Sequence, residues 1–80
     1  VRGEAYGPPL DDFAIASAIK LAVASCPHNE VRHAMEQIGV KMARLCHDPH
    51  GGLDSIIDIG GYARTICMVL DEEEKRDAKD

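Results

Sequence analysis

Residues 41–62 read KMARLCHDPHGGLDSIIDIGGY, and this stretch decides the fold. Its first part has the spacing of a helix end, and its last part has the apolar spacing of a second helix. Between them, DPHGG at 48–52 is rich in residues that turn the chain. Two helices joined by so short a turn are antiparallel neighbours. The stretch therefore predicts a helical hairpin.

Apolar periodicity along the chain predicts three helices, at about residues 10–25, 30–47 and 54–70. Asn29 is the expected N-cap of the second helix, and Leu53 is expected to pack where the third begins. The fold class is therefore all-α: a three-helix domain in which the first helix packs across the hairpin. Residues 71–80, DEEEKRDAKD, are a charged C-terminal extension, either a fraying helix end or a solvated tail.

Each hairpin helix carries an apolar stripe that we expect to be buried. In the second helix the stripe is Val31, Ala34, Met35, Ile38, Met42 and Leu45, and in the third it is Ile56, Ile59, Ala63, Ile66 and Leu70. The pair Gly60-Gly61 interrupts the third helix at a cost of about 1 kcal/mol per Gly relative to Ala. Such a pair is expected where another backbone or a ligand comes close.

The size and composition of the chain favour oligomerisation. It has 80 residues, of which 45% are hydrophobic and only 4% aromatic. A single core is marginal at this length, and this one must be built from small aliphatic side chains. We therefore expect a homo-oligomer that completes the core.

Charge and cysteine content exclude several classes of protein. The net charge is −5, and six of the acids and three of the bases lie in residues 71–80, so the rest of the chain is nearly balanced and no nucleic-acid binder is expected. Three widely spaced cysteines without a CxxC argue against a disulfide framework. No apolar run is long enough for a bilayer and no signal peptide is visible, so we expect a cytoplasmic protein and no membrane partner.

Four charged residues form the strongest candidate site. Lys41 and Arg44 share one face of the second helix, and Asp54 and Asp58 share one face of the third. Two neighbouring carboxylates could hold Mg²⁺, while the two bases hold the phosphate oxygens of a nucleotide. The alternative is a structural lattice of salt bridges, from Arg44 to Asp58 and from Lys41 to Asp54.

Two tyrosines could complete a nucleotide site by stacking on the base. These are Tyr6, which could equally pack over a helix end, and Tyr62, which flanks the aspartate face. The histidines and cysteines match no zinc module in their spacing. We read them as solvated histidines and small buried thiols.

Three segments carry a resemblance to a known family. RGEAYGPPLDDF at 2–13, KMARL at 41–45 and HGGLDSIIDIGGYA at 50–63 resemble a family of small helical domains encoded by phages and prophages, whose function is uncharacterised. The family is distantly similar to the all-α nucleoside-triphosphate pyrophosphohydrolases of the MazG type. That similarity implies a helical bundle, Mg²⁺, nucleotide pyrophosphates as substrates and a location in the cytoplasm of an infected or lysogenic bacterium.

The resemblance to MazG-like enzymes has gaps. Asp54 and Asp58 could stand for the second acidic motif of those enzymes, but the chain has no E-x-x-E for the first. Family members usually have an acidic helix before the Tyr-Gly turn, and this sequence begins after that point. Both gaps bear on hydrolysis more than on nucleotide binding.

Two functions follow from these patterns. One is a nucleotide-binding phage protein, either a metal-dependent pyrophosphohydrolase or a binder only, so the sequence leaves enzymatic activity open. The other is a non-catalytic helical oligomer that binds a host protein or sequesters a nucleotide signal.

Overall fold

The computed structural model describes residues 9–79, and these residues form three helices and no strand: α2 (Pro9–Ala22), α3 (Asn29–His47) and α4 (Leu53–Lys79). The predicted all-α, three-helix fold is confirmed. Asp11 and Asp12 lie in the first turn of α2, where acidic side chains favour the positive end of the helix dipole.

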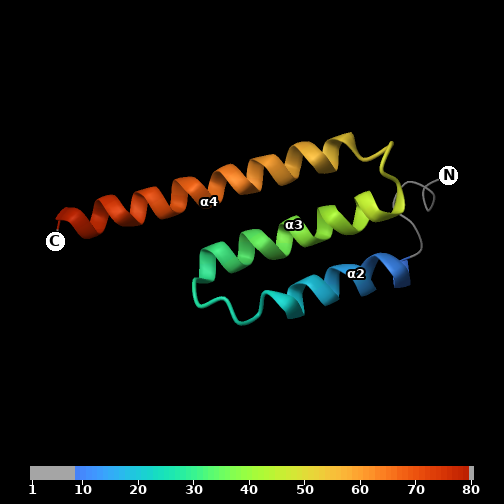
Figure 1. Cartoon of the computed structure of the whole chain (residues 1–80), viewed down its shortest axis with the longest axis horizontal. Coiled ribbons are helices and arrows are strands. Elements are labelled where there is room, and N and C mark those ends of the chain that lie inside the picture. Colours follow the sequence, from blue (N-terminus) through green and yellow to red (C-terminus); the bar gives the residue numbers. More distant parts are fainter. Residues whose placement is uncertain (1–8, 80) are drawn as a thin grey trace.

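The three helices lie side by side in one layer, with α3 in the middle (Figure 1). α2 and α4 each pack on α3, and within residues 9–79 they share no contact with each other. The smallest extent of the chain is 14 Å, against 54 and 24 Å along the other two axes. The first helix therefore lies beside the hairpin. The sequence had suggested that it packs across the hairpin, and this expectation is wrong.

Close approach of α2 to α3 depends on Gly39. A Cβ atom at this position would lie 2.6 Å from Cγ2 of Ile19 and 3.0 Å from its Cβ. Gly39 is buried for this reason, and the isoleucine of α2 sits over the bare backbone of α3. A residue with no side chain thus sets the distance between these two helices.

The N-terminus of α3 is capped by His28 and not by the expected Asn29. Nδ1 of His28 accepts a hydrogen bond from the backbone N–H of Val31 at 3.1 Å. The side-chain oxygen of Asn29 accepts instead from Nη2 of Arg32 at 2.7 Å. Nη1 of Arg32 donates to the carbonyl of Cys26, also at 2.7 Å, and so ties the α2–α3 connection to the first turn of α3.

The turn between α3 and α4 is built around Asp48. Its backbone N–H donates to the carbonyl of Arg44 at 3.0 Å, and its Oδ1 accepts from the N–H of Gly51 at 2.9 Å. Gly52 is buried, and a Cβ there would lie 2.5 Å from Cδ2 of Leu45. The antiparallel helical hairpin of α3 and α4 is confirmed.

The charged segment after residue 70 belongs to α4, which continues to Lys79. Nζ of Lys75 lies 3.0 Å from Oδ2 of Asp71, and Arg76 pairs with Glu72 in the same i, i+4 spacing. In both pairs the acid precedes the base, the order that stabilises a helix better. The end of α4 projects past α3 and carries these pairs (Figure 1).

The layer has almost no core. Ala34 and Ala43 are the buried hydrophobic residues among those described. The predicted stripe of α4 is largely open: Ile56 is 51% and Leu70 is 46% exposed, and Leu53 does not pack at the helix start, since it is 64% exposed. A single layer cannot cover these side chains because it has no second layer to pack against.

Candidate functional site

Two of the four predicted charged residues form an ion pair. Nζ of Lys41 on α3 lies 3.0 Å from Oδ2 of Asp58 on α4. The side chain of Lys41 is 18% exposed and that of Asp58 is 47% exposed, so the pair stands at the edge of the helix–helix contact. The ammonium predicted to hold phosphate thus faces the carboxylate predicted to hold a metal.

The other two charged residues each lie one helical turn away from a member of this pair. Arg44 follows Lys41 by one helical turn and is half-buried on α3. Asp54 precedes Asp58 by one turn and is exposed in the first turn of α4. The alternative expectation was a lattice of salt bridges in which Lys41 pairs with Asp54. In the structure Lys41 pairs instead with Asp58, which lies one turn further along α4.

A shallow hollow of about 380 Å³ lies next to this ion pair, lined by Ile57, Asp58, Gly61, Tyr62 and Thr65. All of its walls come from α4, so the hollow is open to solvent. The hydroxyl of Thr65 donates a hydrogen bond to the carbonyl of Gly61 at 2.9 Å, so this polar group of the hollow already has a partner. Tyr62, which was predicted to stack on a base, lines the same hollow as Asp58. Tyr6 lies outside the described residues.

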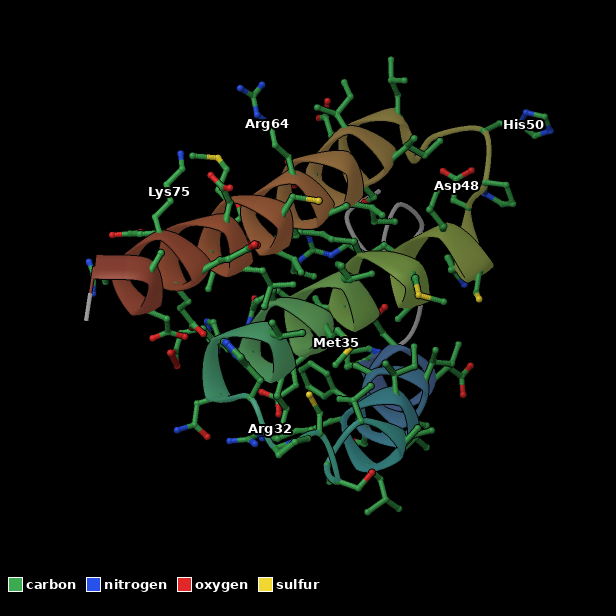
Figure 2. All side chains as sticks on the ribbon, turned by 60° about the vertical axis from the view of Figure 1, so that its left-hand side comes forward. Arg32, Met35, Asp48, His50, Arg64 and Lys75 are labelled. Atoms are coloured by element: carbon green, nitrogen blue, oxygen red, sulfur yellow. The ribbon has the colours of Figure 1, made fainter. Side chains whose placement is uncertain are left out.

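The expected close contact at Gly60-Gly61 is absent from the described chain. A Cβ atom built on either glycine would meet nothing within 4 Å. In Figure 2 Arg64, one turn later, projects away from α3 into open space, as Lys75 does. The glycine pair therefore lies on an uncovered part of α4.

One group with metal-ligand potential could not be seen in the sequence. His28, Glu30 and Glu73 place ligand atoms within 4.8 Å of one another, and Nε2 of His28 lies 2.7 Å from Oε1 of Glu73. Only the three-dimensional path of α4, which brings Glu73 back to the start of α3, reveals this group.

The hydrogen bonds of His28 argue against a metal at this group. Because Nδ1 accepts from the N–H of Val31, it carries no proton, and the ring proton of the neutral imidazole is on Nε2. Nε2–H then donates to Glu73. A metal on Nε2 would need the proton on Nδ1, which would abolish the N-cap. We therefore read His28 as a clamp between α3 and α4.

The other histidines and cysteines, which were not expected to bind a metal, are dispersed. His33, His47 and His50 are all exposed, and His50 points outward from the turn (Figure 2). Cys26 is a half-buried free thiol, whereas Cys46, which was expected to be buried, is exposed, as Cys67 is. Within residues 9–79 none of them shares a metal-binding group.

The two sides of α4 differ in character. The side of α4 that carries Asp58 is mixed, because Asp58 and Thr65 line a hollow together with exposed Ile57. Ile56, Ala63 and Cys67 lie roughly half a turn round α4 from Asp58, so helical geometry places them on the opposite face. We call this surface of α4 the apolar face; its exposed residues are Ile56, Ala63, Cys67 and Leu70.

Comparison with known proteins gives no relatives: no family model, curated protein or solved structure matches the chain. In the described part of the chain, none of the three helices combines the length and the apolar character needed to cross a bilayer. The function must therefore be argued from the geometry.

Proposed function

We propose that this chain is a non-catalytic interaction module whose apolar face docks on a protein surface. The observation that carries the proposal is a single layer of helices in which large apolar side chains stay exposed, with Ile56 and Leu70 among them on one face of α4. Domains become stable by packing two layers around a shared core. A chain that supplies a single layer needs its second layer from a partner.

The charged residues support a structural role in this proposal. The ammonium of Lys41 is already neutralised by Asp58, so neither group presents an uncompensated charge to a ligand. The adjacent hollow is lined by one helix and encloses little. Ligand sites normally bury most of their ligand in a concave cleft.

Site-specific photo-crosslinking in a bacterial cell that expresses the full chain tests the docking surface. A photoreactive amino acid at Leu70 probes the apolar face, and the same amino acid at exposed Thr65 probes the side of α4 that carries Asp58 as a matched control. We expect a discrete adduct from position 70 that is absent from position 65 and lost when Ile56→Glu is added. Equal labelling from both positions, or no adduct from either, would refute the docking surface.

We propose nucleotide binding as a second candidate, supported by one observation: Asp58 and Tyr62 line the same hollow, beside Lys41. The sequence resemblance to phage-encoded domains and MazG-like enzymes also supports it. A phosphate on Lys41 would have to displace Asp58, and Mg²⁺ on Asp58 would have to displace Lys41. The two ligands therefore make opposite demands on this pair.

A thermal-shift screen of nucleotides with and without Mg²⁺ tests this candidate. If phosphate binds Lys41 alone, Asp58→Asn should strengthen binding, because the competing carboxylate is neutralised. If Asp58 holds Mg²⁺, the same substitution should abolish the Mg²⁺-dependent shift, and release of pyrophosphate would identify an enzyme. Absence of any shift at millimolar nucleotide rejects nucleotide binding and leaves the interaction module.

A further inference from the structure

The exposed area of the chain exceeds that of an ordinary monomer. Its accessible surface is 6017 Å² for a mass of 8.7 kDa. A folded monomer of that mass exposes about 4,700 Å², so the excess is about 1,300 Å². The radius of gyration, 15.1 Å, is likewise larger than the roughly 11.6 Å of a globular domain of this length.

This excess area matches what a stable dimer buries. A standard interface removes about 800 Å² from each partner, and obligate interfaces remove more. In the described part of the chain the buried hydrophobic residues are Ala34 and Ala43. A core of ordinary size therefore requires a partner. A partner required for folding must be present whenever the chain is made, and a second copy of the same chain meets this condition.

The side chains along α4 are arranged nearly symmetrically about Ala63, and this order suits an antiparallel pair of α4 helices. Ile56, Gly60, Ala63, Cys67 and Leu70 follow one another at alternating spacings of four and three, the spacing of helices that pack side by side. The large side chains stand at the two ends and the small ones in the middle. When a second α4 runs in the opposite direction, Ile56 of each copy meets Leu70 of the other, while Ala63 lies close to the two-fold axis.

We propose that the protein is a two-fold symmetric dimer in which the apolar faces of two copies pack together, their α4 helices antiparallel and centred near Ala63. This inference rests on the proposed docking function and names its partner. It makes one two-layered core from two single layers. The opposite faces, with the Lys41–Asp58 pair, remain in solvent on both outer sides.

Disulfide crosslinking tests the symmetry. In a full chain with the three cysteines replaced by Ser, Ala63→Cys should form an intermolecular disulfide on mild oxidation at low micromolar concentration. In the proposed dimer Ala63 lies next to the two-fold axis, so its two copies come within the Cα separation that a disulfide allows, about 4.4–6.8 Å. Thr65→Cys, on the opposite side of the same helix, should stay uncrosslinked. A second variant, in which Cys67 is the only cysteine, should also stay uncrosslinked. In an antiparallel pair the two copies of Cys67 lie on opposite sides of the two-fold axis, and they would meet only in a parallel pair.

The outcomes separate this inference from the docking function. Sedimentation of the unmodified chain should give twice 8.7 kDa. Strong crosslinking through both Cys67 and Ala63→Cys would overturn the antiparallel dimer. A folded, helical monomer at micromolar concentration would also overturn it, yet the docking function would survive if position 70 still gave its specific adduct with a different protein. Loss of that adduct as well would refute both proposals.

Discussion

Nζ of Lys41 lies 3.0 Å from Oδ2 of Asp58, and this ion pair joins the middle of α3 to the second turn of α4. Its two members lie on helices that the 48–52 turn already holds side by side. The pair therefore fixes the register of one helix along the other more than it holds them together.

A double-mutant cycle should show a small, positive coupling between these two residues. Because Asp58 is 47% exposed, we expect a coupling free energy of about 0.5 kcal/mol from Lys41→Met and Asp58→Asn, measured by urea unfolding. The coupling should fall in 1 M NaCl, because salt screens exposed charges. Asp54→Asn, one turn earlier on α4, is the control and should show no coupling to Lys41.

His28→Ala should lower the free energy of unfolding by about 1 kcal/mol, the usual cost of losing an N-cap acceptor. Asn at position 28 can still accept from the N–H of Val31, so His28→Asn should be milder. In the intact chain, ¹⁵N chemical shifts of the imidazole should report an unprotonated Nδ1 and a protonated Nε2. A protonated Nδ1 at neutral pH would contradict the capping role and would reopen the metal reading of His28, Glu30 and Glu73.

Alanine substitutions at Gly39 and Gly61 should act in opposite directions. Gly39→Ala gains about 1 kcal/mol of helix propensity but forces a methyl group against Ile19, an overpacking cost of typically 1–3 kcal/mol. We expect net destabilisation in denaturant unfolding. Gly61→Ala meets nothing within 4 Å, so it should stabilise the protein by about 0.5–1 kcal/mol. Destabilisation by Gly61→Ala would show that a partner covers that position as well.

The helical hairpin was predictable because it depends on local signals. Turn-forming residues at 48–52 and the apolar period on either side specify it without reference to the rest of the molecule. The continuation of α4 to Lys79 was also within reach. The i, i+4 pairs of Asp71 with Lys75 and Glu72 with Arg76 are visible in the sequence.

Contacts for which two nearby residues are both suitable could not be predicted from local sequence signals. His28 and Asn29 are both capable N-caps, and the choice between them follows from Arg32, which engages the oxygen of Asn29. Asp54 and Asp58 share a helix face, so only the axial offset of the two helices pairs Lys41 with Asp58. The exposure of Ile56 and Leu70 could not be predicted, because an amphipathic period shows which residues of a helix are apolar but not whether another helix of the chain covers them.

The one-layer arrangement also has a consequence for how the protein folds. Each described helix packs only on its neighbour along the chain, so the contacts within a layer are local in sequence. Chains with such local contacts fold in microseconds to milliseconds. In the proposed dimer, formation of the shared core requires two chains to collide. The native state should therefore be reached at a rate that rises with protein concentration, and newly made chains should expose their apolar face until they meet a second copy.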